Sequence, residues 1–235
     1  MSELLNFFAD NAQLLVDKTI EHIRISAIGI VIAILIALPI GVALGHQHRG
    51  SYVAINISNV LRALPSLALI AISLAFFGLS AINIQLALVA LAIPPILTNA
   101  YTAVDRVDPD AVEAARGMGM TETQVLRGVE LPLSWPLIFA GIRAASVYVI
   151  ATTPLAAIAG GGGLGDIITN QATYHLSGVI AATIVTVVLA FVVDGLLALV
   201  QRAVTPRGIV LPKELHTIVP PVESDVPAET MVAAR

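Results

Sequence analysis

The chain has 235 residues, of which 57% are hydrophobic and only 12% are charged. Soluble domains carry about 25% charged residues, so this composition predicts an integral membrane protein. The formal net charge of −4 argues against a nucleic-acid partner, and the absence of cysteine excludes disulfides and cysteine-ligated metal sites.

The first 18 residues mix apolar and acidic side chains. They lack the basic start and the small-residue cleavage site of a secretory signal peptide. We expect residues 1–19 to form a partly amphipathic lead-in at the membrane interface.

Five apolar stretches are long enough to cross a bilayer as helices. The hydrocarbon core is about 30 Å thick, and about 20 helical residues span it. The predicted spans cover about residues 25–44, 52–78, 84–103, 133–158 and 179–200. The sequence therefore predicts an all-α membrane domain over residues 20–203. The proline-rich residues 204–235 are expected to form a disordered cytoplasmic tail.

Two local features accompany the first and third spans. His46 and His48 follow the first span in a short loop, and we interpret them as a solvated pair rather than a metal site. Pro94 and Pro95 lie inside the third span, where they predict a kink or a break because proline removes a helical hydrogen bond.

One long polar segment, residues 105–132, lies between the third and fourth spans. Asp108 can cap a first short helix that has Pro109 at its first position. Gly117 and Gly119 can end this helix.

A second short helix is expected directly after the first. Thr121 and Gln124 have the spacing of a capping box, and Pro132 is expected to end the segment. The segment is therefore predicted to be a pair of short helices outside the apolar spans.

The same segment resembles the EAA loop of membrane permeases in bacterial ABC importers. The family pattern is Glu-Ala-Ala, three residues, Gly, nine residues, Ile, one residue, Leu-Pro, and the chain matches it from Glu113 to Pro132 except that Val129 replaces the isoleucine. The resemblance implies that the loop is cytoplasmic and that its first helix docks into a groove on an ATP-hydrolysing subunit. It implies ATPase-coupling roles for Asp110, Glu113, Ala114, Ala115, Gly117, Gly119, Leu131 and Pro132. The alternative is an amphipathic surface connector between two membrane helices.

Further segments are similar to the osmoprotectant branch of these permeases, which import glycine betaine, carnitine, choline and related quaternary amines. The similarity covers residues 20–202 and rests on segments 64–69, 116–120, 129–132, 140–143 and 162–166. At residues 62–66 the chain reads Arg-Ala-Leu-Pro-Ser where the branch has Gln-Thr-Ile-Pro-Ser. An importer of an amino acid such as methionine, whose permeases share the five-helix plan, is the alternative.

A glycine-rich polar stretch, residues 160–177, connects the fourth and fifth spans. Gly160, Gly162 and Gly165 fit the dinucleotide-binding fingerprint, but a membrane span rather than a strand precedes them, so we reject that interpretation. The stretch is either a flexible outer gate or a plain turn.

Three ionisable residues, Arg62, Arg143 and Asp194, lie within the spans. A charge in lipid costs at least about 2.5 kcal/mol, so each should face the bundle interior or a wet cavity. They either line a pathway or pair across helices, or they lie near the cytoplasmic interface, where an arginine reaches water and the aspartate finds a hydroxyl partner. The candidate pathway or gate residues are Arg62, Pro65, Arg143, Gly162 and Gly163.

Basic residues mark one side of the predicted membrane domain. The connections at 79–83 and 160–177 carry no Lys or Arg. The alternate set contains Arg49, Arg106, Arg116, Arg127 and Arg202. The positive-inside rule therefore predicts a cytoplasmic central loop and C-terminus, and an N-terminus outside.

The chain contains no Gly-x4-Gly-Lys-[Ser/Thr] motif and no acid–base or nucleophile constellation, so we expect neither an enzyme nor a cofactor in this chain. The resemblance implies a permease subunit in the bacterial inner membrane. Its implied partners are ATPase subunits that bind ATP and Mg²⁺, a second permease copy or paralogue, an extracytoplasmic substrate-binding protein and the lipid bilayer. The alternative of a different class is a passive channel or a membrane scaffold without an ATPase.

Overall fold

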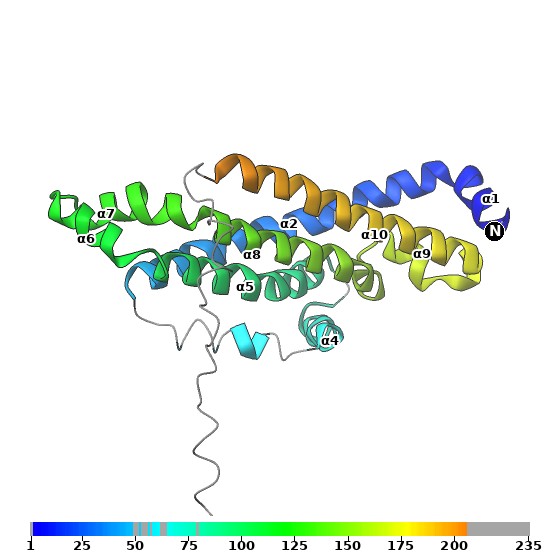
Figure 1. The fold of residues 1–235 in the computed structure, drawn as a ribbon. Coiled ribbons are helices and arrows are strands. Elements are labelled where there is room, and N and C mark those ends of the chain that lie inside the picture. The colour runs from blue at the N-terminus through cyan, green and yellow to red at the C-terminus, as the bar shows by residue number, and fades with distance from the viewer. Residues whose placement is uncertain are drawn as a thin grey trace, which may run out of the picture.

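The computed structural model describes residues 2–48, 52, 56, 58–61, 65–78 and 80–205. The regular structure of this part of the chain is helical, which confirms the predicted fold class (Figure 1). The elements are α1 (Ser2–Asp10), α2 (Ala12–His46), α4 (Ser66–Phe77), α5 (Ala81–Asp105), α6 (Pro109–Gly117), α7 (Glu122–Val125), a π-turn (Leu126–Glu130), α8 (Leu131–Thr152), a 3₁₀ turn (Thr153–Ala159), α9 (Gly165–Thr169) and α10 (Gln171–Val204).

Among the described residues, four helical stretches are long and apolar enough to cross a membrane: Ala12–His46, Ile82–Asp105, Glu122–Ala159 and Gln171–Val204. They contain the first, third, fourth and fifth predicted spans. The described end of the second predicted span is α4, whose 12 residues rise about 18 Å and are too short to cross alone. Arg62 and most of the stretch before α4 lie outside the described residues.

Helix α5 is the centre of the bundle. It packs against α2, α4 and α8, and α8 packs in turn against α10. Leu88, Ile96 and Val104 of α5 are among its buried side chains. Helices α2 and α10 instead carry large exposed apolar side chains, including Leu35 and Phe191. Apolar surface of this extent fits contact with lipid or with other subunits rather than with water.

A stripe of small residues allows α2 to lie close to α5. Gly29, Ala33, Ala37, Gly41 and Gly45 recur every four residues and are all buried. A Cβ on Gly41 would lie 2.7 Å from Ala100 Cβ. Small residues at this spacing are typical of close helix packing in membranes, so the stripe could have been recognised from the sequence.

The N-terminal part of the chain continues the first span instead of standing apart from it. Helix α2 begins at Ala12, well before residue 25, where the first span was predicted to start. Its 35 residues rise about 52 Å, whereas the hydrocarbon core is about 30 Å thick. Helix α1 packs against α10. The predicted interfacial position of residues 1–19 stays a prediction.

The two prolines inside α5 do not break it. Pro94 and Pro95 lie within an uninterrupted helix from Ala81 to Asp105. Of the predicted kink or break, the break is therefore wrong, because packing against α2 and α8 holds the helix together on both sides of the prolines, whereas the kink stays a prediction.

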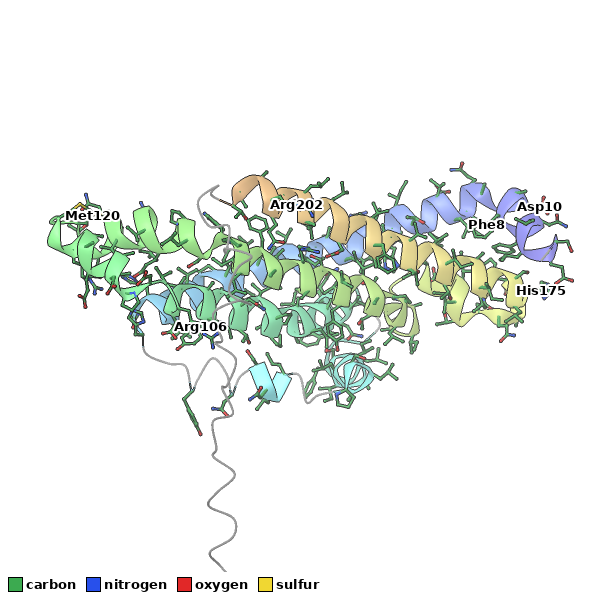
Figure 2. All side chains as sticks on the ribbon, viewed as in Figure 1. Phe8, Asp10, Arg106, Met120, His175 and Arg202 are labelled. Carbon is green, nitrogen blue, oxygen red and sulfur yellow. The ribbon has the colours of Figure 1, made fainter. Side chains whose placement is uncertain are left out.

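The connections gather at the two ends of the bundle. Helices α6 and α7 stand at one end, and α1 and α9 at the other (Figure 1). Met120 marks the first end, whereas Asp10 and His175 mark the second (Figure 2). His175 has φ +56°, and the backbone of α10 is kinked there. The polar central loop therefore lies at the opposite end of the molecule from the glycine-rich stretch.

Candidate functional site

The first helix of the polar segment begins where the sequence predicts. The Asp108 carboxylate accepts a hydrogen bond from the Asp110 backbone N–H at 3.0 Å. Pro109 occupies the first turn, where its missing N–H leaves no bond unmade. The predicted cap of α6 is confirmed.

Gly119 ends α6. It has φ +86°, and the Met120 N–H donates to the Ala115 carbonyl at 3.2 Å. A left-handed glycine followed by this bond is a Schellman motif, which turns the chain sharply. Gly117 is the last residue of α6 and does not make the left-handed turn.

The second helix also forms, but Pro132 does not end the segment. The Thr121 N–H donates to Gln124 Oε1 at 2.8 Å, as the capping box predicts. Helix α7 then continues through the π-turn into α8, so the helical stretch runs from Glu122 to Ala159. The π-turn shifts the hydrogen-bond register, and Pro132 falls in the first turn of α8, where proline is tolerated.

Residues 106–130, which we call the hairpin, enclose a small apolar core of their own. Side chains from α6, α7 and the π-turn fill it. Its buried members are Val107, Val112, Ala115 and Val125, with Met120 and Val129 packed against them. The hairpin is therefore a folded unit and not a flexible loop.

One face of α6 is left open. Asp110, Glu113, Ala114 and Gly117 are exposed, and their spacing of i, i+3, i+4 and i+7 places them on the same side of the helix. Met118, which follows, is 77% exposed. Four of the predicted coupling residues thus share one surface.

The other predicted coupling residues are buried, half-buried or part of a turn, so they shape the hairpin instead of forming its open surface. Ala115 is buried in the hairpin core, and Gly119 forms the turn. Leu131 and Pro132 are half-buried at the start of α8. The motif therefore divides into an exposed surface and the residues that shape it.

A surface ion pair joins the two arms of the hairpin. Arg116 of α6 donates to both carboxylate oxygens of Glu122 at 3.1 and 2.9 Å. These hydrogen bonds raise the pKa of Arg116 above its ordinary value and lower the pKa of Glu122. Both groups stay charged near neutral pH.

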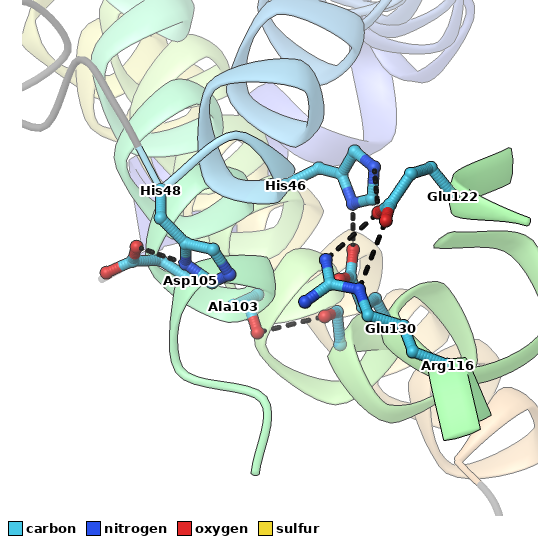
Figure 3. Close-up of polar contacts among 8 residues, drawn as sticks. His46, His48, Ala103, Asp105, Arg116, Glu122 and Glu130 are labelled. Atoms are coloured by element: carbon cyan, nitrogen blue, oxygen red, sulfur yellow. Dashed lines mark hydrogen bonds and ion pairs between the residues drawn. The ribbon is translucent and has the colours of Figure 1, made fainter. Parts of the chain in front are cut away.

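Sequence reasoning missed a buried polar contact between α2 and the hairpin (Figure 3). His46 is the last residue of α2, and its Nδ1 lies 2.6 Å from Glu130 Oε2. Glu130 is only 1% exposed. The interpretation of His46 as a solvated loop residue is wrong, because the carboxylate that partners it comes from 84 residues further along the chain.

Two further contacts fix the neighbouring helix ends (Figure 3). His48 Nδ1 lies 3.1 Å from Asp105 Oδ1 at the exposed end of α5. The Ser134 hydroxyl donates to the Ala103 carbonyl at 2.9 Å, which joins α8 to α5. These contacts join the ends of α2, α5 and α8 to one another next to the hairpin.

The comparison with protein families decides what kind of bundle this is. Residues 28–206 match the family described as binding-protein-dependent transport system inner membrane component. The chain belongs to this family. The resemblance of the hairpin to the loop of membrane permeases is thereby confirmed at the level of the family.

Relatives within this family align over nearly the whole chain. The choline transport system permease protein OpuBB of Bacillus subtilis is 39% identical over 92% of this chain and 100% of its own length. The glycine betaine/carnitine/choline transport system permease protein OpuCB of the same organism is 38% identical over the same shares. The osmoprotectant import permease protein OsmW of Salmonella typhimurium is 33% identical over 88% of this chain and 99% of its own.

Solved structures agree with the fold. The chain superposes on the inward-facing MetNI methionine ABC transporter with a TM-score of 0.72 at 23% identity, covering 84% of this chain and 99% of that chain. An amino acid ABC transporter with histidines gives a TM-score of 0.64 at 20% identity, with coverage of 83% and 96%. The membrane-component fold is therefore shared with both.

In this transport component, Arg143 joins α8 to α10. Its guanidinium donates to both oxygens of Asp194 at 2.9 Å, and a third bond reaches Gln201 Oε1 at 2.8 Å. Gln201 in turn donates to the Pro136 carbonyl at 2.7 Å. The expected pairing across helices is present, whereas a role in the pathway stays a prediction.

The glycine-rich stretch folds back onto α2. Gly162 and Gly163 both have positive φ, and a Cβ on Gly162 would overlap the Glu21 carboxylate. Lys18 donates to Asp166 at 2.6 Å and to Glu21 at 2.9 Å. These contacts hold the stretch against the first helix, and its role as a gate stays a prediction.

The remaining candidate, Pro65, is the N-cap of α4 with an extended backbone. A groove of about 840 Å³ lies between α8 and α10, with Tyr148, Phe191 and Asp194 among its lining residues. Within the described residues, no three His, Asp or Glu side chains gather as a metal site would require.

Proposed function

We propose that this chain is the permease subunit of an ABC importer and that α6 receives an ATP-hydrolysing partner subunit. The observation that carries the proposal is the open face of α6, where Asp110, Glu113, Ala114 and Gly117 are exposed. The opposite face is sealed against the hairpin core. A helix that is already capped and folded can enter a groove on a partner without reorganisation.

A force applied to α6 has a direct route into the membrane domain. Helix α6 packs on α7 and on the π-turn, and both continue into α8. We infer that closure of a pair of ATPase subunits moves α6 and α8 together and switches the pathway between inward-open and outward-open states. ATP and Mg²⁺ bind to the partner in this proposal, because the chain has no nucleotide-binding motif.

The proposed solute is a quaternary-amine osmoprotectant. The support is the set of relatives at 33 to 39% identity that are named for choline, glycine betaine, carnitine or osmoprotectant transport. Aromatic cages usually bind quaternary ammonium groups, and this chain is only 5% aromatic. We therefore assign high-affinity capture to a separate extracytoplasmic binding protein.

The complete pathway is proposed to need a second permease copy or a paralogue, in the closed two-fold pairing that most oligomers adopt. The exposed apolar side chains of α2 and α10 offer surface for this contact and for lipid. The distribution of arginines supports a cytoplasmic hairpin and C-terminus, with the N-terminus outside.

Solute-stimulated ATP hydrolysis by the assembled complex in proteoliposomes tests the proposal. We expect glycine betaine, choline or carnitine to stimulate hydrolysis, and methionine to have no effect. Stimulation by methionine alone would support the amino-acid alternative; the likeness to the methionine transporter is one of fold and favours neither solute. Transport that survives ATP depletion would instead support a passive channel.

A further inference from the structure

The end of α2 and the hairpin meet through polar side chains. His46 Nδ1 lies 2.6 Å from Glu130 Oε2, and His46 Nε2 lies 3.7 Å from Glu122 Oε2. Glu122 also pairs with Arg116 of α6. His46 therefore stands between two carboxylates of the hairpin and closes a chain of contacts from α6 to the first membrane helix (Figure 3).

This contact is not a by-product of apolar packing. The hairpin helices pack on one another and on α8. The apolar core of the hairpin contains no residue of α2. Helix α2 is otherwise linked to the hairpin through its packing on α5 and α8, and the His46 imidazole provides a direct polar contact between the two.

Glu130 makes this contact costly to lose. Its side chain is buried, and its second oxygen, Oε1, has no hydrogen-bond partner among the described residues. A buried carboxylate is destabilising unless a partner compensates for the lost hydration. The short contact to His46 supplies that compensation, so the two side chains should move as a unit.

The position of Glu130 in the backbone adds a second argument. It is the last residue of the π-turn, directly before α8 begins. Single π-turns inside α-helices occur frequently at functional sites. A displacement of α6 and α7 must pass through this turn to reach α8.

We propose that His46 is a positioning residue for energy coupling. It holds the end of α2 to Glu130, so that displacement of the hairpin moves α2 together with α8. This inference rests on the proposed function, because it takes α6 as the site where the ATPase acts. It adds a second transmission route, from the hairpin to the first membrane helix.

The test measures the number of solute molecules imported per ATP hydrolysed by the complete complex in proteoliposomes. We expect His46→Ala and Glu130→Leu, which each remove one side of the hydrogen bond, to keep the ATPase bound and hydrolysing and to lower this ratio roughly tenfold. The double variant should be no worse than either single variant, because both remove the same contact.

Two isosteric replacements distinguish a coupling role from a folding defect. Asn places an N–H donor where His46 has Nδ1, whereas Gln places one nearer the position of Nε2. His46→Asn should therefore recover most of the coupling ratio, and His46→Gln should not. His48→Asn is the matched control, because it replaces the other imidazole with a residue that tolerates the positive φ of that position, and it should behave as wild type.

The outcomes separate this inference from the proposed function. A wild-type complex without ATP-driven uptake would overturn both. A working wild type with an unchanged ratio in His46→Ala, or with equal ratios in His46→Asn and His46→Gln, would overturn only the role of His46. A parallel loss of bound ATPase in every His46 variant would also overturn it, in favour of a purely structural role.

Discussion

Gly119 shows, at the scale of single residues, why the turn after α6 needs a glycine. An added Cβ would meet nothing within 4 Å, but the backbone has φ +86°. The requirement is therefore conformational and not steric. Left-handed backbone costs other residues about 1–2 kcal/mol, and asparagine tolerates it best.

We therefore expect Gly119→Val to shift α6 and to lower ATP-driven uptake, whereas Gly119→Asn should keep most of it. Uptake in proteoliposomes, together with the amount of co-purified ATPase, measures the difference. Equal activity of the two variants would show that the left-handed turn does not matter to coupling.

Arg143 and Asp194 form an ion pair, so the effects of their substitutions on stability should depend on each other. Removal of one partner leaves the other charge without its counter-ion among apolar helices, whereas removal of both does not. Arg143→Met and Asp194→Leu should each lower the melting temperature of the purified protein by about twice as much as the double variant does. A double variant that loses the sum of the two single losses would contradict this.

At the scale of elements, the contact of α2 with α5 depends on small residues. A Cβ on Gly41 would lie 2.7 Å from Ala100 Cβ and 2.9 Å from the Leu97 carbonyl, so a larger side chain must push the helices apart. We expect Gly41→Val to destabilise the protein by about 1–3 kcal/mol. Gly195→Ala in α10 is the control, since nothing lies within 4 Å of its added Cβ.

Thermal unfolding in detergent micelles measures this prediction. Gly41→Val should melt at a lower temperature than wild type, and Gly195→Ala should match wild type or exceed it slightly, because alanine favours helix more than glycine does. Equal melting temperatures for all three would mean that the glycine stripe does not set the distance between α2 and α5.

Local signals predicted the elements that local interactions determine. The Asp108 cap of α6 and the bond from Thr121 to Gln124 both lie where their spacing indicates. The continuation of the helix past Pro132 could not be predicted, because it depends on a shift of hydrogen-bond register in the π-turn. The early start of α2 was also missed, since Lys18 pairs with Asp166, which lies 148 residues further along the chain.

The candidate site divides in the same way. The motif spacing indicated the residues of α6, and the helical period explains why Glu113 and Gly117 share its open face. Nothing in the sequence paired His46 with Glu130, because their contact requires α2, α5 and α8 to be packed first. Long-range polar pairs of this kind carry no periodic signal.

At the scale of the whole molecule, the hairpin is continuous with α8, so we expect a displacement of the hairpin to move this membrane helix. The tip of the hairpin and the glycine-rich stretch lie at opposite ends of the bundle (Figure 2). An ATPase subunit that binds the hairpin can therefore affect the glycine-rich stretch only through the long helices. Charge reversal on the open face of α6 should abolish coupling to the ATPase without unfolding the bundle, because Glu113 is exposed and is not part of the hairpin core.

The most direct measurement is ATP-driven solute uptake by the complete complex in proteoliposomes, compared for wild type, Glu113→Lys and Asp10→Lys. Asp10 is exposed at the opposite end of the molecule, so its reversal is a matched control. We predict that Glu113→Lys loses about tenfold or more of the uptake while its melting temperature is unchanged, and that Asp10→Lys transports as wild type. Wild-type uptake by Glu113→Lys would contradict the claim that the ATPase subunit binds the open face of α6.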